Sequence, residues 1–89
     1  MKIIKRNGSE AIFDISKIIA AIEKANVTVS EADRLNQPQI LDIAATVEKA
    51  CVAMHRAPSV EEIQEMVESN IMECGAFEVA KRYIRYRYT

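Results

Sequence analysis

The chain has 89 residues, of which 49% are hydrophobic and 28% charged, a size and balance typical of one globular domain. No apolar run approaches the roughly 18 residues that cross a bilayer, and no signal peptide follows Met1, so we expect a cytoplasmic protein without a membrane partner. Cys51 and Cys74 are the only cysteines, too few for a four-ligand zinc site, and we expect both to be buried or half-buried thiols.

The net charge of −1 is unevenly distributed along the chain. Residues 1–24 carry five Lys or Arg against three Asp or Glu, and residues 81–89 carry four bases and no acid. The middle, residues 25–80, holds ten acids and only three bases. If the two ends meet in space, they form a basic patch on an acidic protein. Such a patch favours a compact anion over a long nucleic acid.

The first thirteen residues predict a β-hairpin with strands at Lys2–Arg6 and Ser9–Phe13. Asn7-Gly8 between apolar segments is a strong hairpin signal, because a type I′ turn needs positive φ at both central residues. Lys5 and Arg6 stand beside this turn, where exposed backbone N–H groups would suit a polyphosphate. A solvated hairpin tip is the alternative interpretation.

Asp14 is expected to cap a helix over residues 14–26. Its apolar stripe consists of Ile15, Ile18, Ile19, Ile22 and Ala25. Lys17 lies in the first turn, where free N–H groups and the helix dipole favour an anion, although it could equally be a surface lysine. Residues 26–37 are polar and predict a loop, with one short helical turn after Ser30.

Three further helices are expected at residues 38–55, 59–74 and 76–88. Pro38 suits the first position of the second helix, and the run His55–Pro58 ends this helix, because the residue before a proline avoids the α region. The buried face expected for that helix is Ile40, Ile43, Ala44, Val47, Ala50, Cys51 and Met54. Ser59 to Glu62 forms a capping box for the third helix, and Gly75 is its stop. The fourth is expected to bury Phe77, Ala80, and Tyr83 or Ile84.

The predicted fold is therefore mainly α (α+β), a four-helix bundle capped by an N-terminal β-hairpin. His55, the only histidine, falls at a helix end, where it would cap carbonyls. Four glutamates of the third helix have the spacing of a solvated face: Glu61, Glu62, Glu65 and Glu68. Since no nucleophile or paired carboxylate is indicated, the sequence predicts neither a catalytic site nor a metal site.

Four stretches, in order, resemble the successive motifs of the ATP-cone domain. They are Ile3–Gly8, Phe13–Ile18, Ser59–Glu68, and Gly75 with Val79–Arg87. ATP-cones are regulatory modules, usually at the N-terminus of ribonucleotide reductase catalytic subunits, and the resemblance covers essentially the whole chain. It implies a hairpin cap over a four-helix bundle, with ATP or dATP, and with Mg²⁺, bound between them.

The resemblance also implies roles for particular residues. The triphosphate would be contacted by Lys5, Arg6, Asn7, Gly8 and Lys17. The base and sugar would be lined by Ile3, Ile22, Val60 and Gln64. Lys81 and Arg87 of the last helix would add contacts. Asn7 stands where many cones have Asp.

In such a module ATP supports activity and dATP switches the enzyme off by changing subunit assembly. The implied partners are the nucleotide, the catalytic domain of the parent reductase and other subunits. The chain ends where a cone ends, so we expect a regulatory domain without its catalytic part. Its last helix is similar to cones of anaerobic, glycyl-radical reductases. A small nucleic-acid-binding domain and a helical protein-interaction domain are the alternatives.

Overall fold

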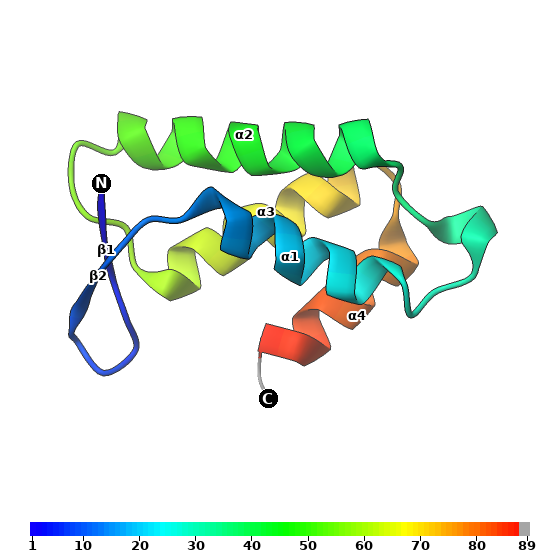
Figure 1. Cartoon of the computed structure of the whole chain (residues 1–89), viewed down its shortest axis with the longest axis horizontal. Coiled ribbons are helices and arrows are strands. Elements are labelled where there is room, and N and C mark those ends of the chain that lie inside the picture. The colour runs from blue at the N-terminus through cyan, green and yellow to red at the C-terminus, as the bar shows by residue number, and fades with distance from the viewer. Residues whose placement is uncertain (88–89) are drawn as a thin grey trace.

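The computed structural model describes residues 1–87, which form a two-stranded hairpin and four helices (Figure 1). The elements in chain order are β1 (Lys2–Ile4), β2 (Glu10–Ile12), α1 (Ile15–Asn26), the short 3₁₀ helix η1 (Glu31–Asp33), α2 (Gln37–Ala53), α3 (Val60–Glu73) and α4 (Phe77–Arg87). The predicted fold class is confirmed. The last helix was predicted to include Tyr88, which lies outside the described residues.

Helices α1 and α3 each pack against both α2 and α4, which lie on opposite sides of the α1–α3 pair (Figure 1). α1 begins after Asp14, whose side chain accepts a hydrogen bond of 3.0 Å from the Ser16 N–H. From its apolar stripe, Ile18, Ile22 and Ala25 are buried in the core between the helices. The remaining isoleucines of the stripe, at its margins, are half-buried.

Helix α2 begins one residue earlier than Pro38 suggested, because Asn36 caps it. The Asn36 side chain accepts from the Gln39 N–H, and the Gln39 side chain accepts from the Asn36 N–H, each at 2.9 Å. This capping box was missed in the sequence. The buried residues of α2 are Ile40, Ile43, Ala44, Val47 and Cys51. Ala50 was predicted among them but is exposed, because it lies at the edge of their stripe.

Two predictions near Gly75 are wrong. Cys74 is exposed, and Phe77 keeps 58% of its surface accessible. Gly75 itself has a φ of 78°, as a glycine that ends a helix should. The buried residues of α4 are Val79, Ala80 and Tyr83. Since successive helical residues are separated by about 100°, Phe77 falls on the side opposite Val79 and faces solvent.

The hairpin turn differs from the type I′ turn that Asn7-Gly8 suggested. Only Gly8 has a positive φ, 85°, and its N–H donates to the Lys5 carbonyl at 2.9 Å. This pattern matches a three-residue loop, in which a type I turn is followed by a left-handed glycine. The Asn7 side chain accepts from the Ser9 N–H at 3.0 Å and holds the far side of the turn. The tip is therefore wider than a two-residue turn.

The hairpin is fixed to the bundle through the loop that precedes α3. β1 pairs with β2, with Ile3 opposite Ala11, and on its other side the Ile4 N–H donates to the Pro58 carbonyl at 2.9 Å. Ile4 also forms an isolated parallel bridge with Ser59. Because a lone hairpin is marginal in water, this pairing sets where the tip lies relative to the helices.

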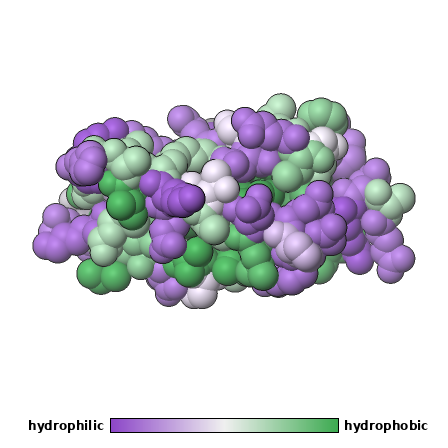
Figure 2. Space-filling model, turned by 90° about the horizontal axis from the view of Figure 1, so that it is seen from above, coloured by the Kyte–Doolittle hydropathy of each residue, from purple (hydrophilic) through white to green (hydrophobic). Residues whose placement is uncertain are grey.

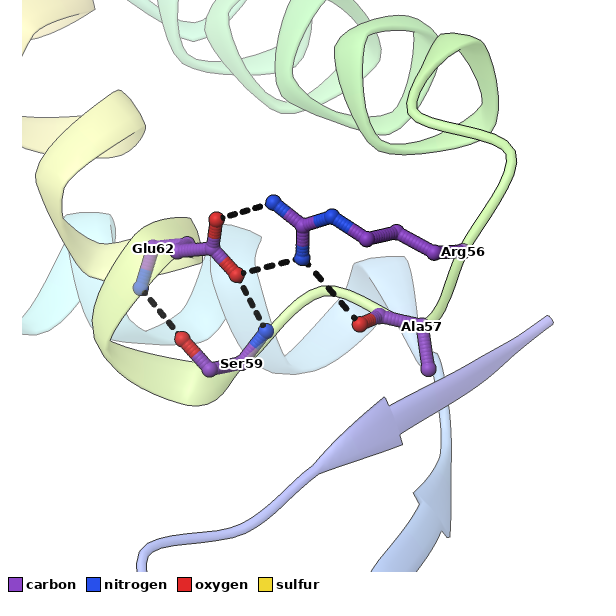
Figure 3. Close-up of polar contacts among 4 residues, drawn as sticks. All are labelled: Arg56, Ala57, Ser59 and Glu62. Atoms are coloured by element: carbon purple, nitrogen blue, oxygen red, sulfur yellow. Dashed lines mark hydrogen bonds and ion pairs between the residues drawn. The ribbon is translucent and has the colours of Figure 1, made fainter.

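The same loop is held by an ion pair between Arg56 and Glu62 (Figure 3). The guanidinium donates to both carboxylate oxygens, at 2.9 and 2.6 Å. Glu62 also accepts from the Ser59 N–H at 2.9 Å, completing the predicted capping box. The Arg56 hydrogen bonds, followed by that from Ser59, lower the pKa of Glu62 to about 2. One carboxylate thus ties the loop under the hairpin to α3.

We expect the stability contributed by Glu62 to be lost in acid. Its pKa is lower in the folded chain than the ordinary 4.5, so the contribution is complete above that value and disappears as the pH falls toward about 2. Glu62→Gln should therefore lower the melting temperature at about pH 6, and the difference from wild type should shrink by about pH 2.5. Thermal melts of both proteins across this range measure it. Glu65→Gln, an exposed neighbour on α3, is the matched control.

The long connection between α1 and α2 is closed by one buried side chain. The Asn26 amide donates to the Leu35 carbonyl at 3.0 Å and accepts from the Leu35 N–H at 2.8 Å. Val29 and Leu35 turn inward and are buried in the core, while η1 forms the exposed bend between them. The predicted helical turn after Ser30 corresponds to η1.

The surface on the α2 side mixes hydrophobic and hydrophilic side chains (Figure 2). Leu41 and Val52, the exposed large apolar residues of α2, lie near opposite ends of the helix. Among residues 1–87, no helix combines the length and the apolar composition needed to cross a bilayer.

Candidate functional site

The hairpin, α1, α3 and α4 enclose a hollow of about 290 Å³, called here the inner hollow. Its lining includes Ile3 and Lys5 from the hairpin, Lys17 from α1, Val60 and Gln64 from α3, and Tyr83 from α4. The two lysines are exposed, whereas Tyr83 is buried. The inner hollow therefore has apolar walls and cations at its rim, a composition that suits a ligand with an apolar part and an anionic part.

A second, wider hollow of about 510 Å³, the outer hollow, shares part of this lining. It is lined by Lys5, Arg6, Asn7, Val60, Gln64, Tyr86 and Arg87. A third, of about 500 Å³ between α1 and α4, includes Lys17, Lys24 and Gln64. Gln64 lines all three hollows, which therefore adjoin one another, and we call them together the depression between the hairpin tip and the α1–α4 side of the bundle.

The cations around this depression differ in how they are held. None of the ion pairs among residues 1–87 includes Lys5 or Lys17. Arg6, by contrast, lies 3.2 Å from a Glu61 carboxylate oxygen, and Arg87 lies 3.3 Å from one of Glu68. Lys24, which lines the third hollow, is also outside these ion pairs, so the three lysines are the cations that can meet an anion without first giving up a carboxylate.

Two ionisable groups in the inner hollow have fixed charge states at neutral pH. Hydrogen bonds from the Ser16 hydroxyl and N–H lower the pKa of Asp14 below its ordinary value, so it remains a carboxylate. Burial raises the pKa of Tyr83 to about 12, so its phenol stays neutral. Ser16 donates to Oδ1 of Asp14 through both groups, from its hydroxyl at 2.6 Å and from its N–H at 3.0 Å.

Another hollow, of about 400 Å³ between η1 and the start of α4, lacks such cations. The arginine in its lining, Arg34, donates to the carbonyls of Val27 and Val29 at 3.1 and 3.0 Å. Its guanidinium is used to hold the loop. An anion is therefore better served at the depression beside the hairpin.

The structure brings together most of the residues singled out in the sequence. Ile3, Lys5, Lys17, Val60 and Gln64 line the inner hollow, and Arg6, Asn7 and Arg87 line the outer one. Gly8 shapes the turn through its positive φ. Several further lining residues were not singled out as site residues: Ala11, Phe13, Ala21, Tyr83 and Tyr86. Phe13 had only the signal of the last residue of the predicted hairpin, and Tyr83 that of a residue expected to be buried in the last helix.

Two of the expected residues lie elsewhere. Ile22 has no exposed surface and belongs to the core, so its side chain does not reach the wall of any of these hollows. Lys81 is exposed on α4 and pairs with Glu78 at 3.3 Å, outside the lining of the depression. In α1 the next turn brings Ala21, rather than Ile22, to the inner hollow.

A small helical bundle with a hairpin cap and a cationic depression beneath its tip is the arrangement that the ATP-cone resemblance implied. The family model for the ATP cone domain matches residues 1–89, and the chain belongs to this family. Within residues 1–87, no group of three or more acidic, histidine or cysteine side chains could hold a metal ion.

The chain is similar to parts of several reductases. It is 36% identical to the ribonucleoside-diphosphate reductase subunit alpha of Chlamydia pneumoniae, over 96% of this chain and 9% of that protein. It is 37% identical to the anaerobic ribonucleoside-triphosphate reductase of Haemophilus influenzae, over 97% of this chain and 12% of that protein. It is 39% identical to the vitamin B12-dependent ribonucleoside-diphosphate reductase of Mycobacterium tuberculosis, over 97% of this chain and 12% of that protein. The chain thus spans about a tenth of the length of these relatives, and their identities do not single out the anaerobic class.

Proposed function

We propose that this chain is an allosteric nucleotide-binding module that senses ATP against dATP and switches the overall activity of a ribonucleotide reductase through subunit assembly. The observation that carries the proposal is the placement of Lys5 and Lys17. They come from the hairpin and from the first turn of α1, they line one hollow, and they take part in no ion pair within residues 1–87. Two such lysines hold phosphates through charge-assisted hydrogen bonds.

The rest of the depression suits the base and sugar of a nucleotide. Ile3 and Val60 supply apolar surface beside the lysines, and Gln64 supplies an amide that can both donate and accept. ATP and dATP share their phosphates and base, so only the sugar can distinguish them. A ligand shifts an equilibrium between two states by its differential affinity for them, and one hydroxyl must supply that difference. Gln64 is the polar side chain best placed to sense it.

The proposal assigns this chain regulation and no chemistry of its own. Mg²⁺ would be held mainly by the nucleotide phosphates and water, as is usual for this ion. The catalytic domain of the parent reductase and its other subunits are the proposed partners, on the strength of the relatives' names and of the tenth of their length that the chain spans.

The test is a thermal melt of the chain with nucleotide. ATP or dATP at about a hundred times its dissociation constant should raise the melting temperature by on the order of 10 °C, because the ligand binds only the folded state. Adenosine, which lacks phosphates, should give little shift. A folded chain that shows no shift with millimolar ATP or dATP would contradict the proposal. Where the melting temperature does rise, calorimetric titration gives the number of nucleotides bound and the preference between ATP and dATP.

A further inference from the structure

Arg6 joins three parts of the molecule that are far apart in the sequence. From the hairpin tip, its Nη2 donates to the backbone carbonyl of Arg87, at the end of α4, at 2.8 Å. Its Nε lies 3.2 Å from Glu61 Oε1, in the first turn of α3. We call this set of contacts the Arg6 clasp. It closes the hairpin tip onto the ends of two helices.

The contacts of the clasp engage Arg6, a cation that also lines the depression. Arg6 lines the outer hollow beside Lys5, so a polyphosphate held by Lys5 lies within the neighbourhood of the Arg6 guanidinium. About half of each side chain surface in the Arg6–Glu61 pair is exposed, 53% and 49%. Exposed pairs are weak and are screened by salt. A polyphosphate carries several negative charges and is a stronger partner for a guanidinium than one carboxylate.

We infer that Glu61 is an internal competitor of the nucleotide for Arg6. Binding of the phosphates takes the guanidinium from Glu61 and from the α4 carbonyl, so the hairpin tip is released from the end of α4 when the site fills. This inference rests on the proposed function, and it adds a regulatory contact to the same site. Glu61 lowers affinity by holding Arg6, and it couples occupancy of the site to the end of α4.

The first measurement needs no nucleotide. Glu61→Gln removes the charge that holds Arg6, so the amides of the hairpin tip should exchange with deuterium faster than in wild type. Glu65→Gln makes the same change one turn along α3, at an exposed glutamate outside the ion pairs of residues 1–87, and should leave the tip unchanged. Equal exchange in all three proteins would show that the contact between Glu61 and Arg6 does not hold the tip.

The second measurement is calorimetric titration with ATP. Glu61→Gln should bind ATP about two- to fivefold more tightly than wild type, the range that an exposed ion pair supports, and Glu65→Gln should match wild type. The gain should vanish when Glu61→Gln is made in an Arg6→Gln background, since the competition acts through Arg6. This double-mutant cycle isolates the pair.

The outcomes separate the inference from the proposed function. If wild type binds ATP but Glu61→Gln binds no more tightly, the inference is overturned and the nucleotide site stands. If the gain persists in the Arg6→Gln background, Glu61 acts through its general negative field, and the clasp mechanism is overturned. If folded wild type binds no ATP or dATP, both the proposed function and this inference are refuted.

Discussion

Replacing Lys5 and Lys17 together by glutamine is expected to abolish measurable ATP binding while the chain remains folded. A hydrogen bond to a charged group contributes about 1.5–3 kcal/mol, so each lysine should account for about a 10- to 100-fold change in affinity. Neither lysine takes part in an ion pair within residues 1–87, and both are exposed, so their loss should leave stability almost unchanged. Titration calorimetry measures the affinity, and circular dichroism verifies the fold.

Lys49→Gln provides the matched control for the lysine variants. Lys49 is exposed on α2 and lies in the lining of none of the hollows beside the hairpin, yet its loss changes the net charge as much as replacing Lys5 or Lys17 singly. ATP affinity should stay within about twofold of wild type, because salt largely screens an exposed charge that lies outside the binding site. A Lys49→Gln variant as weak as the single lysine variants of the site would show that only the overall charge matters.

Ile22→Ala is expected to cost the chain about 2–5 kcal/mol of folding free energy, the usual penalty for truncating a fully buried isoleucine. Ile22 has no exposed surface and lies among the core residues. A domain of this length has a stability of roughly 4–13 kcal/mol, so the variant should lose a large share of its stability and melt at a lower temperature than wild type. Urea denaturation monitored by circular dichroism measures the change.

The same variant tests whether Ile22 touches a ligand. Leu41→Ala on α2 removes a side chain of the same size at a position that is 47% exposed, and should cost much less stability. At a temperature where Ile22→Ala is folded, its ATP affinity should remain within a few-fold of wild type, since Ala21 rather than Ile22 lines the inner hollow. A large loss of ATP affinity with little loss of stability would show that Ile22 contacts the nucleotide.

Local patterns predicted the helices well because each has its own signal. Asp14 caps α1 and Ser59 with Glu62 forms the box of α3, both through contacts within a few residues. Two of the failures lie where tertiary packing decides. Ala50 and Phe77 have apolar side chains, but whether a helix edge is covered depends on where the neighbouring helices lie.

The residues of the candidate site fall into the same two groups: those with a local signal, and those whose contacts depend on tertiary packing. Lys5 and Arg6 stand at the predicted turn and Lys17 at a predicted helix start, so local patterns and the family resemblance located them. No sequence pattern could show that Arg6 contacts Glu61 and the end of α4, since these groups meet only through the folding of the whole bundle. The turn type was wrong for a local reason. The Asn7-Gly8 pair alone does not reveal a three-residue loop closed between Lys5 and Gly8.

The Asn26 amide forms hydrogen bonds with both backbone groups of Leu35, so the excursion of the chain around η1 is a ring closed by its own two hydrogen bonds. Because Val29 and Leu35 of this ring are buried in the core, only its exposed tip, residues 30–33, can change in length without disturbing the spacing of α1 and α2. Lengthening its tip would cost only chain entropy, which grows slowly with loop length. The excursion is thus a place where this protein can acquire or lose residues without moving the helices that carry the site.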